Sequence, residues 1–339
     1  MTTTGRRRTE PLDAGFPFGP NSHEQNPPDI IIRSSDLLDF YAHKQILSFG
    51  SPFFRHMLAF PEPTGQNANP TKNGLSIVAL PEKSGTLGPA LSLLYPRQVQ
   101  PAEIVGGMSP VEIKLDTFES IYEACRKYDV AGYHDILVTT LAEPRFLEDD
   151  AHLVFVIACN LRLHPIACNA AIRTLKSPIT DRPSPYLRSA PGNTFWQLQD
   201  FKYAVARELK MLLKTYAAGA PVSDMGPEYD HVWWAPNGHA EFCGPSEPDR
   251  DDAYAEVEPA AWFQDHIGRI EDVCFLRPDP EHIARCLVEL HGPQLADISE
   301  CRMCMDDAAE NLTQLSGWFE KTANKRIKAL ASSYTFGCL

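Results

Sequence analysis

The sequence has no long apolar run. Its longest uninterrupted apolar stretch is Leu153–Cys159, far shorter than the ~20 residues that a membrane-spanning helix requires. Residues 1–28 contain no apolar segment of the kind that forms the centre of a secretory signal peptide. These absences predict a protein of the cytoplasm or nucleus that has no membrane partner.

The sequence is also poor in positive charge. Lys and Arg total 31 against 44 Asp and Glu, which gives a net charge of −13. Binding nucleic acid through its phosphates needs clustered Lys and Arg, and the one tight basic cluster is Arg6–Arg8. It lies in a stretch rich in Pro and Gly, and residues 1–26 are predicted to form a disordered tail. We expect no direct binding to nucleic acid.

The residue patterns of common enzyme classes are missing. The sequence contains no P-loop, no G-x-G-x-x-G after a strand, no H-E-x-x-H and no G-x-S-x-G. Its nine cysteines lack an export signal, which indicates reduced thiols rather than a disulfide framework. The sequence therefore predicts a protein that is not an enzyme.

Regular elements begin after Asp29. The run Ile30–Ile32 predicts a buried strand, and the alternation of apolar and polar residues over Leu38–Ala42 predicts a second strand that pairs with it. A helix is predicted from His43 onward. Gly50 breaks that helix, with Ser51 as the N-cap and Pro52 as the first residue of the next helix.

This order of elements closely resembles the start of a BTB/POZ domain. The shared features are Asp29 at the head of the first strand, the His43–Lys44 step out of the second strand, and the Ser51–Phe54 step into the second helix. In that family, Asp29 and His43 would tie the strand to the helix by hydrogen bonds, rather than act in acid–base chemistry.

The elements that follow extend the resemblance. Residues 75–81 predict a third strand, 87–96 a third helix, and 116–141 a closing helix pair. The resemblance implies an α/β (α+β) BTB/POZ domain over residues 27–142. The residues to which it assigns structural or interaction roles are Asp29, His43, Lys44, Ile46, Leu47, Phe49, Ser51, Pro52, Phe53 and Phe54.

BTB domains are protein-recognition modules, and many form homodimers through the first helix. The resemblance therefore makes residues 43–50 a candidate interface, for a second copy or for another protein partner. The alternative is that Ile46, Leu47 and Phe49 are all buried within one monomer.

The remainder of the chain is predicted to be mostly α-helical, as in the fungal BTB proteins that it resembles. A helix pair at residues 149–175, within 143–178, is expected to pack after the BTB domain. Further helices are predicted within residues 179–339, at 194–218 (opened by a capping box at Thr194), 260–276, 280–291 and 300–331.

An acidic loop is predicted at residues 221–260. Residues 221–266 hold five Glu and six Asp against a single base, Arg250. Such stretches are usually solvated surface. Together with Arg6–Arg8, the acidic loop raises the further alternative of a transcriptional cofactor.

One set of residues suggests zinc. Cys301 and Cys304 form a C-x-x-C pair, and His239 and Cys243 are spaced four residues apart. Together they would make a tetrahedral Cys3His site.

Two other interpretations of these residues stay open. His282 and Cys286, four residues apart on a predicted helix, are rival ligands. Alternatively, the cysteines are buried core thiols, which is a common fate of free cysteine.

A further set of residues bears on binding to a cullin. Some BTB proteins act as substrate adaptors of cullin ubiquitin ligases through a hydrophobic-x-Glu motif that follows the third helix. In that window, residues 101–103 and 110–112 place Pro where an apolar residue belongs, and Leu80–Glu82 precedes the helix. The sequence thus favours a non-catalytic scaffold protein over a ligase adaptor.

Overall fold

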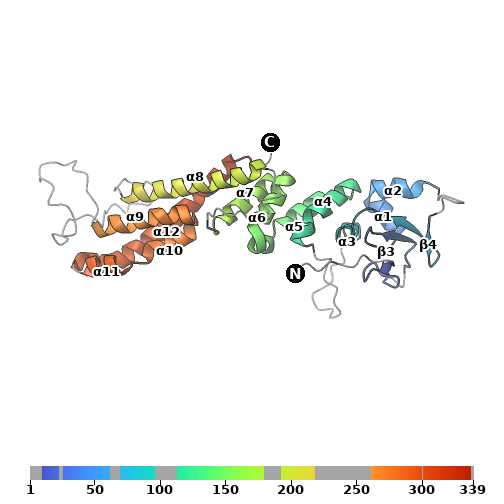
Figure 1. Ribbon diagram of the computed structural model, residues 1–339, viewed down its shortest axis with the longest axis horizontal. Coiled ribbons are helices and arrows are strands. Elements are labelled where there is room, and N and C mark those ends of the chain that lie inside the picture. Colours follow the sequence, from blue (N-terminus) through green and yellow to red (C-terminus); the bar gives the residue numbers. More distant parts are fainter. Residues whose placement is uncertain are drawn as a thin grey trace. The chain divides into compact units, whose positions relative to one another are not determined.

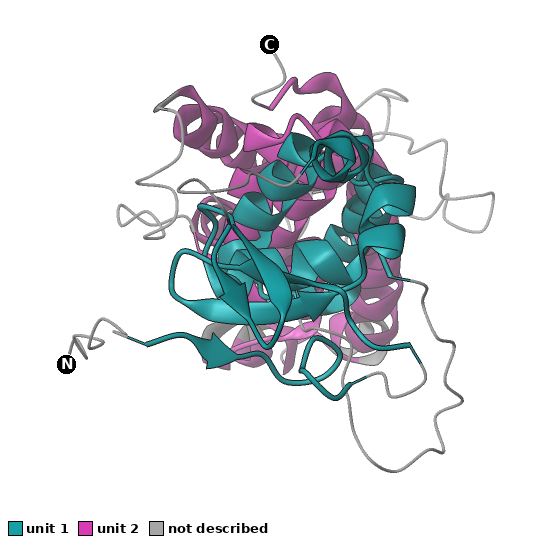
Figure 2. Cartoon of the chain, turned by 90° about the vertical axis from the view of Figure 1, so that its right-hand side faces the viewer, with its two compact units in different colours: residues 1–146 teal, residues 147–339 magenta. Residues whose placement is uncertain are grey.

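The computed structural model describes residues 10–22, 26–61, 69–95, 113–178, 192–217, 261–299 and 301–336. The chain divides into two compact units, residues 1–146 and 147–339 (Figure 2). The first is mixed α/β and the second is helical (Figure 1). This confirms the predicted α/β class with a helical remainder.

The N-terminal unit contains a five-stranded sheet in the order β1-β3-β2-β5-β4. Its strands are β1 (Leu12–Asp13), β2 (Ile30–Arg33), β3 (Leu38–Ala42), β4 (Thr71–Lys72) and β5 (Leu75–Ala79). Strand β2 pairs antiparallel with β3 and parallel with β5. The three predicted strands are therefore present.

One face of the sheet carries a small apolar core. Ile31, Tyr41 and Ile77 face one another across β2, β3 and β5 and are buried, with Leu75 packed against them. Because side chains alternate along a strand, Arg33 and Asp39 project from this same face.

The N-terminal stretch differs from its prediction. Residues 1–26 were expected to form a disordered tail, but Leu12–Asp13 pairs parallel with β3. Phe18 is buried, and its ring packs edge-on against Phe40 and Tyr95. A two-residue strand and a single aromatic anchor have no periodicity, so the sequence pattern did not reveal them.

The helices of the first unit follow the predicted order. They are α1 (Lys44–Gly50), α2 (Pro52–Ala59), α3 (Ser84–Ser92), α4 (Phe118–Lys127) and α5 (Tyr133–Leu141). The Ser51 hydroxyl oxygen accepts the Phe54 amide N–H at 3.0 Å, as an N-cap does. The same hydroxyl donates to the Tyr128 carbonyl at 2.5 Å, which links α2 to the end of α4.

The second unit is a helical bundle. Its helices are α6 (Pro144–Asn160, beginning at the end of the first unit), α7 (His164–Thr174), α8 (Gly192–Ala217), α9 (Ala261–Leu276), α10 (Pro280–Val288), α11 (Gly292–Ser299) and α12 (Arg302–Ser333). Helix α12 packs against α7, α8, α10 and α11. The predicted helix pair at 149–175 corresponds to α6 and α7, and α7 belongs to this bundle.

Two of the predicted helices in the second unit differ from the structure in a way that their sequence explains. Helix α8 begins at Gly192, so Thr194 lies inside it rather than at its N-cap. Helix α10 ends at Val288, and a further helix, α11, begins at Gly292. The helix predicted at 280–291 was expected to stop before Gly292–Pro293, yet Pro is equally suited to the first turn of a new helix.

None of the helices in the described part of the chain combines the length and the apolar character that crossing a bilayer requires.

Candidate interaction surface

Asp29 and His43 fix the step from β3 into α1. Asp29 Oδ1 accepts the Lys44 amide N–H at 2.7 Å. His43 Nε2 lies 2.7 Å from the Asn26 carbonyl oxygen, so this nitrogen carries the proton. His43 Nδ1 accepts from the Tyr95 hydroxyl at 3.0 Å. Burial raises the pKa of Tyr95 to about 12, so its hydroxyl keeps the proton that it donates.

The residues of α1 divide into a buried and an exposed set. Leu47 is fully buried and Ile46 is half-buried, but the Phe49 side chain is 86% exposed. Burial of all three within one monomer is therefore wrong for Phe49. On α2, Phe54 is buried, while Phe53 is 37% exposed.

The exposed rings lie beside basic and polar groups. Arg55 Nε donates to the Ser48 carbonyl at 3.0 Å, which holds the guanidinium at the end of α1. His56 is exposed and lies three residues after Phe53, on the same side of α2. We call Phe49, Phe53, Arg55 and His56 the α1–α2 surface.

The Phe53 ring is held in place by two buried aromatic side chains. Its ring centroid lies 5.4 Å from that of Phe54 and 5.1 Å from that of Tyr128, both in edge-on geometry. Because Phe54 and Tyr128 are buried, Phe53 stands on a rigid base. A ring fixed in this way loses little conformational entropy when a partner covers it.

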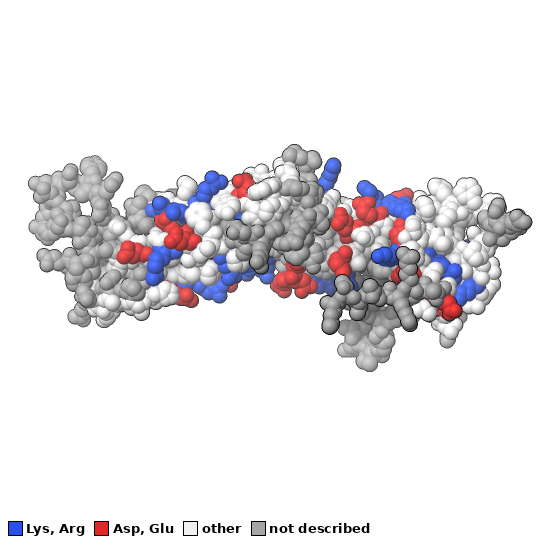
Figure 3. Space-filling view, viewed as in Figure 1, with Lys and Arg blue, Asp and Glu red and all other residues white. Residues whose placement is uncertain are grey.

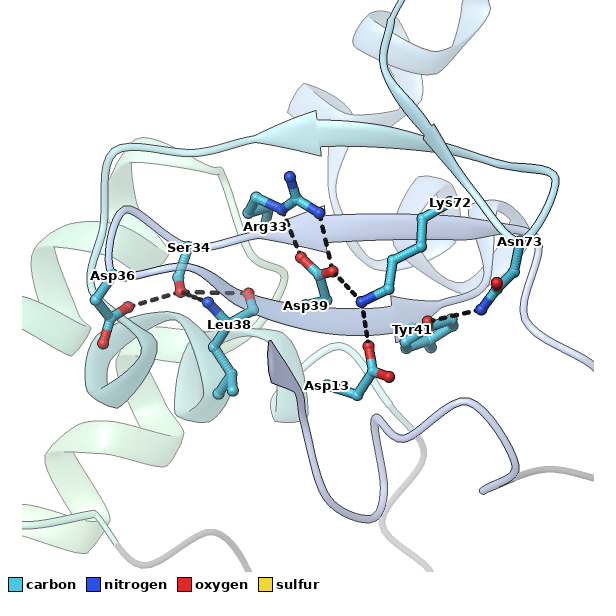
Figure 4. A network of polar contacts seen from close by, with 9 residues as sticks. All are labelled: Asp13, Arg33, Ser34, Asp36, Leu38, Asp39, Tyr41, Lys72 and Asn73. Atoms are coloured by element: carbon cyan, nitrogen blue, oxygen red, sulfur yellow. Dashed lines mark hydrogen bonds and ion pairs between the residues drawn. The ribbon is translucent and has the colours of Figure 1, made fainter. Parts of the chain in front are cut away.

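A polar network occupies the sheet face that carries Arg33 and Asp39 (Figure 4). The Asp39 carboxylate is fully buried and accepts Arg33 Nε at 2.6 Å and Lys72 Nζ at 2.8 Å. Lys72 Nζ also lies 2.7 Å from the Asp13 carboxylate, which joins the two edge strands β4 and β1. The sheet is therefore curled, and the network closes it.

The network also sets the charge state of Asp39. Burial alone would raise the pKa of this carboxyl, but the hydrogen bonds from Arg33 and Lys72 outweigh burial and hold the pKa below its usual range. Two cations and two carboxylates satisfy one another here. We therefore assign the network a role in stability.

The Leu80–Glu82 triplet is engaged within its own unit. Leu80 is buried. The Glu82 carboxylate pairs with Lys127 Nζ at 2.7 Å and accepts the Tyr128 hydroxyl. These partners outweigh the effect of burial and lower the pKa of Glu82. Residues 101–103 and 110–112 lie outside the described residues.

Half of the predicted zinc site can be located. Cys301 is the N-cap of α12, and Cys304 follows in its first turn; both are buried. The Trp262 indole N–H donates to Cys304 Sγ at 3.2 Å. His239 and Cys243 lie outside the described residues.

The rival ligands are neighbours on α10. Cys286 Sγ lies 3.9 Å from His282 Nε2. Among the described residues, no three His, Cys, Asp or Glu side chains gather closely enough to hold a metal ion. The four-residue zinc site therefore stays a prediction.

Metal analysis separates the zinc site from the core-thiol interpretation. If the four residues bind zinc, the purified chain will carry about one zinc per chain by mass spectrometry, because Cys3His sites are closed and bind tightly. Cys304→Ser will then lose the zinc, while Cys125→Ser, at a buried cysteine of the other unit, will keep it. A metal-free chain with unchanged stability in chelator identifies core thiols.

No family model, curated protein or solved structure matches this chain.

The structure also reveals a buried amine that the sequence did not indicate. Lys202 lies on α8 with 2% of its surface exposed, and no ion pair or hydrogen bond links it to another described residue. Burial lowers the pKa of Lys202 to about 8. The pKa of His152 on α6 is lowered by its own burial and by the charge of Lys202.

Proposed function

We propose that the chain is a non-catalytic scaffold protein whose residues 27–142 form a BTB/POZ domain that binds another protein through the α1–α2 surface. The observation that carries the proposal is the exposure of Phe49 on α1 and of Phe53 on α2, two helices that pack against each other. A phenylalanine that is left in water forgoes about 1.5 to 3 kcal/mol of burial. Exposed apolar groups that lie together are typical of interaction sites.

The order of elements supports the BTB interpretation. Two antiparallel strands lead through the Asp29–Lys44 hydrogen bond into α1, and Ser51 caps α2 directly afterward. The third strand, the third helix and the closing helix pair follow. These are the elements that the resemblance implies, in the same sequence order.

A scaffold is favoured over a ligase adaptor. Of the three hydrophobic-x-Glu candidates, the triplet that the structure describes has Leu80 buried and Glu82 paired with Lys127. Calorimetry with the N-terminal part of a BTB-type cullin tests the adaptor function directly. Binding at micromolar affinity or tighter would establish the adaptor in place of the scaffold.

The test of the proposed function is Phe49→Glu. We expect an unchanged thermal midpoint, since the side chain is exposed, and at least ~10-fold weaker capture of the partner proteins, since a central aromatic anchor can contribute 2 kcal/mol or more. Capture from a lysate of the source cells, quantified by mass spectrometry, measures the effect.

Leu276→Glu is the matched control, because Leu276 is 65% exposed on α9 in the other unit. Equal capture by the wild type and by both variants would contradict the proposed function. Sedimentation velocity on the same proteins reveals a homodimer, which Phe49→Glu would dissociate if the partner is a second copy.

A further inference from the structure

The α1–α2 surface has an unusual charge for this chain. Residues 44–59 contain Lys44, Arg55 and His56 and not a single Asp or Glu, although the whole chain has a net charge of −13. On the face drawn in Figure 3, acidic and basic side chains of the described residues are interspersed. The exposed rings thus lie on helices that carry charge of one sign.

Arg55 is fixed by one hydrogen bond and is otherwise exposed. Its Nε is fixed to the Ser48 carbonyl at 3.0 Å, while the side chain is exposed. Within the described part of the chain, Arg55 forms no ion pair. A guanidinium held by one nitrogen still offers the donors of its other two to a carboxylate.

The segment around Tyr128 adds little to the charge of the α1–α2 surface. Next to Tyr128, whose ring contacts Phe53, Lys127 pairs with Glu82. The exposed Asp129 follows. Two exposed carboxylates therefore lie near the surface, Asp129 here and Asp29 at the start of α1, and Arg55 is bonded to neither.

We propose that the α1–α2 surface binds a short acidic helical segment of a partner protein, with apolar or aromatic side chains on one face of the helix and carboxylates beside them. The apolar side chains pack on Phe49 and Phe53, and a carboxylate pairs with Arg55. This inference rests on the proposed function and adds the chemistry of the partner. Complementary charge of this kind gives specificity and fast association.

A second copy fits this surface less well. A two-fold interface places the same surface on both sides of the contact. Neither α1 nor α2 offers an acidic side chain that could pair with Arg55 of a second copy. Like charges across an interface oppose association.

Fluorescence anisotropy with three matched peptides tests the inference on the full chain. The probes are fluorescein-labelled helical peptides of about 14 residues with Phe or Leu at i, i+3, i+4 and i+7. Their remaining positions are Glu, Gln or Lys. We expect the Glu peptide to bind at least ~10-fold more tightly than the Gln peptide at low salt, and the difference to shrink to about 3-fold in 0.5 M salt.

Variants separate the charge from the apolar contact. Arg55→Glu should reverse the preference, so that the Lys peptide binds more tightly than the Glu peptide. Arg55→Lys keeps the charge but loses the bidentate contact. Its affinity for the Glu peptide should lie between those of the wild type and Arg55→Glu. Phe49→Ala should weaken all three peptides. Arg285→Glu, at an exposed arginine of the other unit, should change nothing.

Three outcomes would overturn the inference. Equal binding of the Glu and Gln peptides would show that the partner need not be acidic. The proposed function would still hold if Phe49→Ala weakened the binding of both peptides. Absence of Glu-peptide binding at 100 µM overturns the inference directly. A homodimer that dissociates on Phe49→Glu and excludes the Glu peptide assigns the surface to a second copy.

Discussion

Replacing Lys202 with methionine is expected to stabilise the helical unit by about 2 to 3 kcal/mol. Methionine has nearly the same length and shape as lysine but carries no charge to desolvate. A pKa lowered from 10.5 to about 8 corresponds to about 3 kcal/mol, at about 1.4 kcal/mol per unit. No described ion pair or hydrogen bond of Lys202 is lost in exchange.

The sign of the pH dependence follows from the direction of this shift. The pKa of Lys202 is lower in the folded chain, so between pH 8 and 10.5 the unfolded chain binds more protons. The free energy of unfolding must therefore rise with pH across this window. Lys202→Met should remove that rise, so that the variant and the wild type converge at high pH.

Tryptophan fluorescence is suited to this measurement. All five tryptophans lie between Trp196 and Trp318, within the second unit, so urea unfolding followed at this signal reports on the helical unit alone. Lys328→Met, at an exposed lysine of α12, is the matched control and should change the midpoint little. A midpoint for Lys202→Met at or below that of the control would refute the prediction.

A second readout concerns His152. The charge of Lys202 contributes to the lowered pKa of this histidine, in addition to its burial. Lys202→Met should therefore raise the pKa of His152 part of the way toward its usual range. Titration of the imidazole resonances by NMR detects this change, which altered packing alone would not produce.

Asp39→Asn is expected to destabilise the N-terminal unit by about 3 to 5 kcal/mol. Asp39 is the shared acceptor of Arg33 and Lys72 and is fully buried. The substitution leaves Arg33 without its ion-pair partner and Lys72 with Asp13 alone, and breaking a buried ion pair costs about that amount. Hydrogen exchange across β1–β5, measured by mass spectrometry, should show faster exchange in every strand.

Asp13→Asn is the matched control for Asp39→Asn. Asp13 belongs to the same network, but its side chain is 39% exposed, so we expect a loss below about 1 kcal/mol. Equal rates of amide hydrogen exchange across β1–β5 in the two variants would contradict the prediction.

The acid limb of the stability curve gives an independent check on Asp39. Its pKa is lowered in the folded state, so its contribution is complete above the unfolded value of about 3.9 and is lost as the pH falls through the folded pKa. Asp39→Asn should flatten the stability curve in that range.

The central strands and the first two helices were predictable because their signals are local. Ile30–Ile32 and the alternation over Leu38–Ala42 specify paired strands, and the Ser51–Pro52 step specifies a capped helix. The network around Asp39 was not predictable, because Lys72 lies 33 positions further along the chain. A contact of that kind depends on the curl of the sheet, which no short pattern encodes.

The candidate surface was predicted only in part. The pattern placed Ile46, Leu47 and Phe49 on one short helix, but their exposure depends on what packs against that helix. In the structure Leu47 is covered and Phe49 is not. Lys202 was missed for the same reason, since a lysine in a helical pattern is expected to face solvent.

The curl of the sheet has a consequence for the behaviour of the chain at high concentration. Exposed strand edges are templates on which further chains can add and begin aggregates. Here each edge strand is only two residues long, and a lysine on one edge is locked to an aspartate on the other. Lys72→Ala removes this contact together with the ion pair to the buried Asp39, so the variant should expose both edges and aggregate at concentrations where the wild-type protein stays in solution.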